Sequence, residues 1–221
     1  MAGTARRGHT AMIRPGLYAI ADTATLGAEA LEPAVAAALA GGATLVQYRD
    51  KGDDTQRRRR QAAHLARLCR ARGVRLIVND DVELAAGVAA DGVHVGGDDA
   101  APEVARHRLG PGAIVGVSCY ASLERARRAR AAGADYIAFG RVYASSTKAS
   151  SVRAPLSLLR QARDETGLAV CAIGGITAER APEVVAAGAD LVAVIGDLWD
   201  SPDVEERARR FAAAFAEGAA P

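Results

Sequence analysis

One unit recurs along this chain from Leu17 onward, and it limits the fold more than any other feature. Each unit is a short apolar run of β-forming residues, a polar loop, an alanine-rich amphipathic stretch and a glycine. Such runs are nearly continuous rather than alternating, which is typical of parallel strands buried on both faces. Eight of them are predicted strands: Leu17–Ala21, Thr44–Tyr48, Arg75–Val78, Gly92–Val95, Ala113–Val117, Tyr136–Phe139, Ala169–Ile173 and Leu191–Ile195.

Glycine-containing turns separate the predicted helices from the next strand. The clearest are Gly133-Ala134-Asp135 and Gly188-Ala189-Asp190, which are nearly identical and mark a repeated unit. Eight β/α units in a chain of 221 residues predict a single compact (β/α)8 TIM barrel over residues 16–221. We expect residues 1–15 to be a disordered extension. An open doubly wound sheet competes with the barrel, but no Gly-x-Gly-x-x-Gly follows the first strand.

Charge and hydropathy narrow the class of partner. The chain has 28 basic and 26 acidic residues, so its net charge of +2 shows no overall bias towards nucleic acid or a membrane. No apolar run approaches the roughly 18 residues needed to span a bilayer. Four consecutive arginines, Arg57–Arg60, lie in a predicted helix from Asp54 to Arg72, and we interpret them as a solvated helix face rather than a nucleic-acid patch.

Cysteine usage bears on the compartment. Cys69, Cys119 and Cys171 are odd in number and have no Cys-x-x-Cys spacing. They predict free thiols in a reducing cytoplasm rather than a disulfide or zinc framework. The expected partners are small phosphorylated molecules, and the sequence leaves a homo-oligomer open.

In a (β/α)8 barrel the functional groups gather at the carboxyl ends of the strands. The third and fourth predicted strands lead to Asp80 and Asp99. Neighbouring parallel strands lie about 5 Å apart. The two carboxylates could therefore share one Mg²⁺, an ion that takes one or two carboxylates and leaves room for substrate phosphates. Alternatively these aspartates cap the following helices, a role that we expect of their neighbours Asp81 and Asp98.

Two glycine-containing loops predict a phosphate site. Gly174-Gly175 follows the seventh strand and Gly196 follows the eighth, where backbone N–H groups and a helix N-terminus commonly bind phosphate in barrels. The alternative is a tight turn without a ligand. Arg49, Lys51 and Lys148 add cations to the same rim, which suits a second and more highly charged anion such as a diphosphate. The residues therefore indicate group transfer with diphosphate as the leaving group.

Seven motifs in order along the chain resemble the thiamine phosphate synthase family. The motifs are Gln47–Lys51, Ile77–Asp81, Asp91–Asp99, Gly116–Tyr120, Thr147-Lys148, Ala172–Thr177 and Val194–Gly196. The resemblance runs from about Leu17 to Phe215 and implies a (β/α)8 transferase. Such an enzyme joins 4-amino-2-methyl-5-hydroxymethylpyrimidine diphosphate to 4-methyl-5-hydroxyethylthiazole phosphate, giving thiamine phosphate and diphosphate. Diphosphate leaves first, and the thiazole nitrogen captures the resulting pyrimidine methylene cation.

The resemblance also implies a role for each site residue. Asp80 and Asp99 would hold one Mg²⁺ per subunit. The pyrimidine diphosphate would be bound by Gln47, Tyr48, Arg49, Asp50, Lys51, Asn79, Ser118 and Lys148, of which Arg49, Lys51, Ser118 and Lys148 are the expected catalytic residues. The thiazole phosphate would be bound by Ser145, Ser146, Thr147, Gly175, Ile195 and Gly196. Arg141, Ala144 and Gly196 depart from the residues usual in the family. At Arg141 and Ala144 we expect a more mobile loop and an added charge near the site. At Gly196 the usual serine hydroxyl is absent, so we expect a weaker thiazole phosphate site.

Two other functions compete with the synthase. The related thiazole tautomerase shares the barrel and the phosphate site, but it lacks the complete Asn-Asp…Asp set. It also has a histidine shortly after the strand-five serine, where this chain has Cys119 and Tyr120. A non-catalytic sensor of a phosphorylated metabolite would leave the carboxylates and cations of the rim unexplained.

Three aromatic residues receive mainly structural interpretations. His94 lies within the fourth strand and is expected to be a hydrogen-bonded core histidine. Trp199 follows the last strand and is expected to anchor the last helix. Tyr18, in the first strand, is expected to border the pyrimidine pocket.

Overall fold

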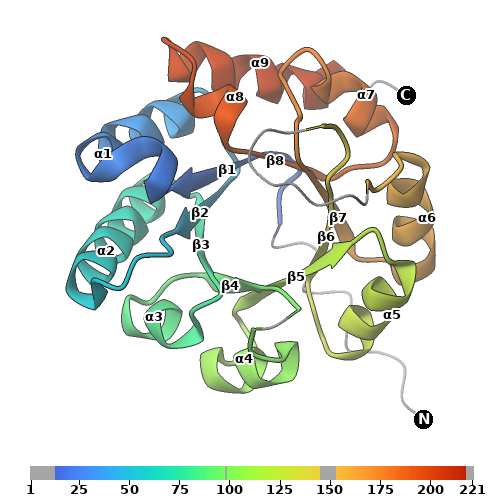
Figure 1. The fold of residues 1–221 in the computed structure, drawn as a ribbon, viewed down its shortest axis with the longest axis horizontal. Coiled ribbons are helices and arrows are strands. Elements are labelled where there is room, and N and C mark those ends of the chain that lie inside the picture. The colour runs from blue at the N-terminus through green and yellow to red at the C-terminus, as the bar shows by residue number, and fades with distance from the viewer. Residues whose placement is uncertain (1–12, 98, 145–152, 218–221) are drawn as a thin grey trace.

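The predicted strands form a closed parallel barrel. The structure is a computed structural model and describes residues 13–97, 99–144 and 153–217. The strands are β1 (Gly16–Asp22), β2 (Leu45–Arg49), β3 (Arg75–Asn79), β4 (Gly92–Val95), β5 (Ile114–Tyr120), β6 (Tyr136–Gly140), β7 (Ala169–Ile173) and β8 (Leu191–Val194). They pair in chain order, and β8 also pairs in parallel with β1 (Figure 1). This closed order confirms the (β/α)8 barrel and excludes the open sheet.

Helices follow the strands and surround the barrel (Figure 1). They are α1 (Thr23–Ala40), α2 (Thr55–Ala71), α3 (Val82–Gly87), α4 (Pro102–Leu109), α5 (Leu123–Ala131), α6 (Ser157–Thr166), α7 (Ala181–Ala186), α8 (Gly196–Trp199) and α9 (Val204–Glu217). The α2 helix begins after Asp54, whose carboxylate accepts the Arg57 N–H, and it matches the predicted helix to within a residue at each end. Across the residues that the structure describes, no helix has the length and apolarity to cross a membrane.

The core has two layers, which explains why the strand sequences are apolar on both faces. Tyr18 and Ile20 of β1 point into the barrel with residues such as Ile77, whereas Leu17 and Ala19 pack between the sheet and the helices. Side chains of successive strand residues point to opposite faces. Each strand therefore contributes to both layers, and its residues belong alternately to one layer and the other.

The aspartates of the repeated Gly-Ala-Asp turns also accept backbone hydrogen bonds from neighbouring strands. The Asp135 carboxylate accepts the Val115 N–H of β5 at 2.7 Å, and the Asp190 carboxylate accepts the Val170 N–H of β7 at 2.9 Å. Each aspartate thereby fixes the strand that neighbours its own. Asp135 is also paired with Arg106 of α4 at 2.5 Å.

The end of the barrel opposite the carboxyl ends of the strands includes Ile13. This side chain is buried and belongs to the cluster inside the barrel. The predicted boundary at residue 16 therefore omits a residue of the core, because an apolar side chain ahead of β1 covers the barrel interior. Residues 1–12 of the predicted extension lie outside the part of the chain that the structure describes.

The cysteines are free, as predicted. Cys69, Cys119 and Cys171 are all buried, and none of them forms a disulfide. Burial raises the pKa of Cys69 and of Cys119 to about 12, which keeps both thiols protonated and unreactive.

Candidate functional site

The carboxyl ends of β2 to β5 form one sector of the barrel mouth, the end at which the βα loops meet. The predicted diphosphate and metal residues of this sector that fall within the described chain come from these strands and the loops after them. They are Gln47 and Arg49 on β2, Lys51 after β2, Asn79 at the end of β3, Asp80 after β3, Asp99 after β4, and Ser118 on β5.

Asp80 and Asp99 lie close together, within range of a direct electrostatic interaction between their carboxyl groups. Asp80 has the uncommon φ of 62° and its N–H donates to the His94 carbonyl at 2.8 Å. Left-handed non-glycine residues are costly and cluster at functional sites. The Asp99 carboxylate accepts the Gly96 N–H at 2.7 Å. Burial raises the pKa of Asp99, and the adjacent Asp80 raises it further.

This pair of carboxylates fits a hard divalent cation. Among the described residues no group of three or more His, Cys, Asp or Glu side chains could hold a metal. A cation at Asp80 and Asp99 would therefore take its other ligands from substrate oxygens and water. Mg²⁺ is commonly bound in this way, with one or two carboxylates and substrate phosphates.

Two cations come from β2 and the loop after it. The Lys51 ammonium forms an ion pair with Asp80, and the Arg49 guanidinium forms one with Asp22. Asp22 is buried, and its side chain also accepts the Ala24 N–H at the start of α1. Sequence reasoning missed Asp22, although it is the last residue of β1 and so repeats the pattern of a strand that ends at a carboxylate.

A chain of hydrogen bonds crosses the barrel beneath the mouth. The Gln47 amide donates to the Tyr18 hydroxyl at 2.7 Å, and that hydroxyl lies 2.8 Å from the Tyr136 hydroxyl. His94 links the Tyr136 hydroxyl, 2.9 Å from Nδ1, to the Ser118 hydroxyl, 2.8 Å from Nε2. Burial lowers the pKa of His94 to about 4, so the imidazole is neutral. The prediction of a hydrogen-bonded core histidine is confirmed, whereas Tyr136 was missed.

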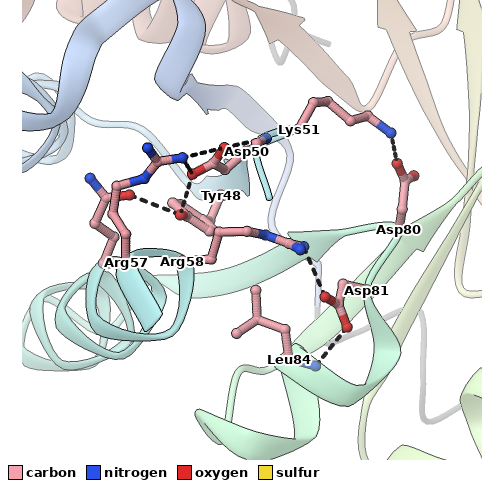
Figure 2. Close-up of polar contacts among 10 residues, drawn as sticks. Tyr48, Asp50, Lys51, Arg57, Arg58, Asp80, Asp81 and Leu84 are labelled. Atoms are coloured by element: carbon pink, nitrogen blue, oxygen red, sulfur yellow. Dashed lines mark hydrogen bonds and ion pairs between the residues drawn. The ribbon is translucent and has the colours of Figure 1, made fainter. Parts of the chain in front are cut away.

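Tyr48 and Asp50 do not face the mouth. Tyr48 is buried in the layer between sheet and helices, where its hydroxyl contacts Gln61 of α2 at 2.9 Å and Asp50 at 3.2 Å. The Asp50 carboxylate is 2% exposed and paired with Arg57 (Figure 2). The alternation of side chains along β2 sends Gln47 and Tyr48 to opposite faces. We therefore leave Tyr48 and Asp50 out of the substrate site.

The predicted thiazole phosphate residues are in part described. Gly175 follows β7 with φ 67°, and a Cβ there would lie 2.3 Å from the Ala144 carbonyl oxygen. Gly175 therefore also serves the packing of one loop on another. Ile195 is the N-cap of α8, which begins at Gly196. The Trp199 indole donates to the Ile20 carbonyl at 2.7 Å and so anchors α8 rather than the last helix, α9. Ser145, Ser146, Thr147 and Lys148 lie outside the described residues.

Comparisons with known proteins agree with this geometry. Residues 17–198 match the family described as "Thiamine monophosphate synthase". The thiamine-phosphate synthase of Halorhodospira halophila is 54% identical over 183 residues, which cover 83% of this chain and 88% of that protein. That of Nitrosococcus oceani is 51% identical over 196 residues, or 89% and 90% of the two chains.

A comparison with solved structures also finds a member of this family. The thiamine phosphate pyrophosphorylase from Pyrococcus furiosus superposes with a TM-score of 0.85 at 33% identity, covering 95% of this chain and 100% of the other. The chain belongs to the thiamine monophosphate synthase family.

Proposed function

We propose that this protein is a transferase that joins 4-amino-2-methyl-5-hydroxymethylpyrimidine diphosphate to 4-methyl-5-hydroxyethylthiazole phosphate. The products are thiamine phosphate and diphosphate. One observation carries the proposal: Asp80, Asp99 and Lys51 meet at the barrel mouth in a chain that matches the family across that sector. A hard cation and a diphosphate both need this combination of charges.

The chemistry requires charge stabilisation rather than a general base. The bond between the pyrimidine methylene carbon and the diphosphate oxygen breaks, and both electrons leave with the diphosphate. The thiazole nitrogen then donates its lone pair to the methylene carbon and forms the new C–N bond. The protein has to stabilise the developing negative charge and hold the two substrates in line.

The described residues divide between these tasks. Asp80 and Asp99 would hold Mg²⁺, which when bound supplies positive charge to the diphosphate oxygens. Arg49, Lys51 and Asn79 would bind the same oxygens, together with Lys148. Gln47 and Ser118, at the two ends of the hydrogen-bonded chain, would orient the pyrimidine.

The thiazole phosphate would be bound across the mouth, where β7 and β8 end. Backbone N–H groups at Gly175, Ile195 and Gly196 would contact it, with the hydroxyls of Ser145, Ser146 and Thr147 added from the loop after β6. Glycine at position 196 supplies no hydroxyl, so the backbone carries more of the binding there. Substrates of this kind and three buried free thiols support a cytoplasmic enzyme.

Incubation of the purified protein with both substrates and Mg²⁺ tests the proposal. We expect thiamine phosphate and diphosphate in equal amounts, and neither product when one substrate is omitted. Conversion of a thiazole phosphate tautomer without the pyrimidine would instead identify the tautomerase. Binding of the thiazole phosphate with no turnover would identify a sensor.

A further inference from the structure

The run of four arginines on α2 divides into two pairs with different surroundings. Arg57 and Arg58 are partly buried and reach the loops of the mouth, whereas Arg59 and Arg60 are exposed. Arg59 and Arg60 line, with residues such as His64 and Arg67, a surface hollow of about 630 Å³. The predicted solvated helix face therefore holds for Arg59 and Arg60, whereas Arg57 and Arg58 are only partly solvated.

Arg57 holds the loop after β2. Its Nη2 donates to both carboxylate oxygens of Asp50, at 3.1 and 2.8 Å (Figure 2). The same carboxylate accepts the Gly52 N–H at 2.8 Å and the Tyr48 hydroxyl at 3.2 Å. Burial works to raise the pKa of Asp50, but the Gly52 N–H and Arg57 outweigh it, so the pKa lies below its ordinary value. Asp50 is thus a charged anchor directly before Lys51.

Arg58 holds the loop after β3 in an equivalent way. Its Nη2 donates to Asp81 at 2.8 Å, and the other oxygen of Asp81 accepts the Leu84 N–H at 2.8 Å, which caps α3 (Figure 2). The predicted capping role of Asp81 is confirmed. Asp81 directly follows Asp80, which has the uncommon left-handed φ of 62° and lies beside Asp99.

The two loops also meet each other. The Lys51 side chain extends from the loop after β2 to the Asp80 carboxylate in the neighbouring loop after β3, as Figure 2 shows. Lys51 is adjacent to Asp50, which Arg57 binds. Asp80 is likewise adjacent to Asp81, which Arg58 binds. In both arginines the Nε atom is buried without a hydrogen-bond partner among the described residues, which lowers stability. The arrangement is better explained by the orientation of the loops than by stability alone.

We propose that Arg57 and Arg58 are positioning residues for the transfer reaction: Arg57 orients Lys51 through Asp50, and Arg58 orients Asp80 through Asp81. The inference rests on the proposed roles of Lys51 and Asp80. Neither arginine touches substrate in this account. Preorganised charges stabilise a transition state without moving, and a misplacement of about 1 Å can cost about 10²-fold in rate. Lysine lacks the planar fork of arginine and cannot replace it fully.

Steady-state kinetics of Arg57→Ala and Arg58→Ala, with Arg59→Ala as the matched control, test the proposal. We expect kcat to fall about 10-fold or more in the first two variants and to stay within twofold in the third. Arg58→Ala should also raise the Mg²⁺ concentration that gives half-maximal activity, and Arg57→Ala should raise the KM for the pyrimidine diphosphate. Arg58→Lys should recover part of the loss.

Asp81→Asn tests the same contact if Arg58→Ala fails to fold. Asparagine keeps the cap of α3 but removes the charge that pairs with Arg58, so this variant should reproduce the shift in Mg²⁺ requirement. The proposal is overturned if Arg57→Ala, Arg58→Ala and Asp81→Asn behave like Arg59→Ala while Lys51→Ala and Asp80→Ala lose activity. If Lys51→Ala and Asp80→Ala are also active, the proposed site itself is wrong.

Discussion

At the scale of single residues, Lys51 is the described cation with the most direct path to the diphosphate. Its side chain is 59% exposed and paired with Asp80, so it contributes little to stability but points its charge at the carboxylate pair. We expect Lys51→Ala to lower kcat by about 10²–10³-fold, the usual cost of one lost charge-stabilising donor, with an unchanged melting temperature. A kcat within a few-fold of the original would remove Lys51 from the catalytic residues.

The hydrogen bonds of the His94 ring predict its tautomer. If Tyr136 donates to Nδ1, a neutral His94 has its one proton on Nε2 and donates it to Ser118. The Ser118 hydrogen is then left for the substrate. Nitrogen-15 NMR should show the neutral Nε2–H form from pH 7 down to pH 5, since burial lowers the pKa of His94 to about 4. An imidazolium at pH 6, or the Nδ1–H form, would contradict this.

His94 also makes the free energy of unfolding depend on pH, and the direction follows from its lowered pKa. The folded pKa of His94 is about 4 and the unfolded value is about 6.5. Between these values the unfolded chain binds a proton that the native state does not. The His94 contribution to the free energy of unfolding is therefore complete above pH 6.5 and is lost as the pH falls towards 4.

At the scale of elements, the Asp135 turn ties α4 and two strands together. Its carboxylate is 5% exposed, pairs with Arg106 and accepts the Val115 N–H. Asp135→Ala would leave both groups without this partner, so we expect the free energy of unfolding to fall by roughly 3 kcal/mol with little change in kcat. Denaturant titration beside Glu124→Ala checks this, because that carboxylate is 67% exposed in an i,i+4 pair. Equal losses would contradict the account.

The loop after β7 gives another prediction for an element. Gly175 has a left-handed φ and lies against the Ala144 backbone, so Gly175→Ala must displace the two loops that border the proposed thiazole phosphate site. We expect the KM for that substrate to rise about 10-fold, corresponding to a loss of about 1.4 kcal/mol. Gly167→Ala is the control, since Gly167 has φ 64° at the end of α6 with open space around it. An equal rise in KM in the control would contradict the prediction.

The elements also show where sequence reasoning succeeds and where it stops. The eight strands follow from apolar runs because parallel strands are buried on both faces. The motif Gln47–Lys51 identifies the correct segment. Which of its residues face the barrel interior depends on their alternation along β2: Gln47 faces inward and Tyr48 faces the helices. The partners of Arg57 and Arg58 depend on how α2 lies across two loops, and no local pattern specifies that arrangement.

At the scale of the whole molecule, the barrel brings distant segments to one rim. Asp22, Lys51, Asp80 and Asp99 come from four successive βα loops, and closure of the sheet places these loops beside those of β7 and β8. The rule that function lies at the carboxyl ends of barrel strands therefore locates the site before any side chain is placed. The roles of individual residues need the loop geometry as well.

A Mg²⁺ titration of diphosphate release tests most directly whether Asp80 and Asp99 form a metal-dependent diphosphate site. Both substrates are supplied to the original protein, to Asp99→Ala and to Asp164→Ala, which changes an exposed aspartate on α6. We predict Mg²⁺-dependent release with an equal amount of thiamine phosphate in the first and third proteins. Asp99→Ala should lose it by about 10²-fold or more. Turnover that is independent of Mg²⁺, or an Asp99→Ala protein as active as Asp164→Ala, would contradict the account.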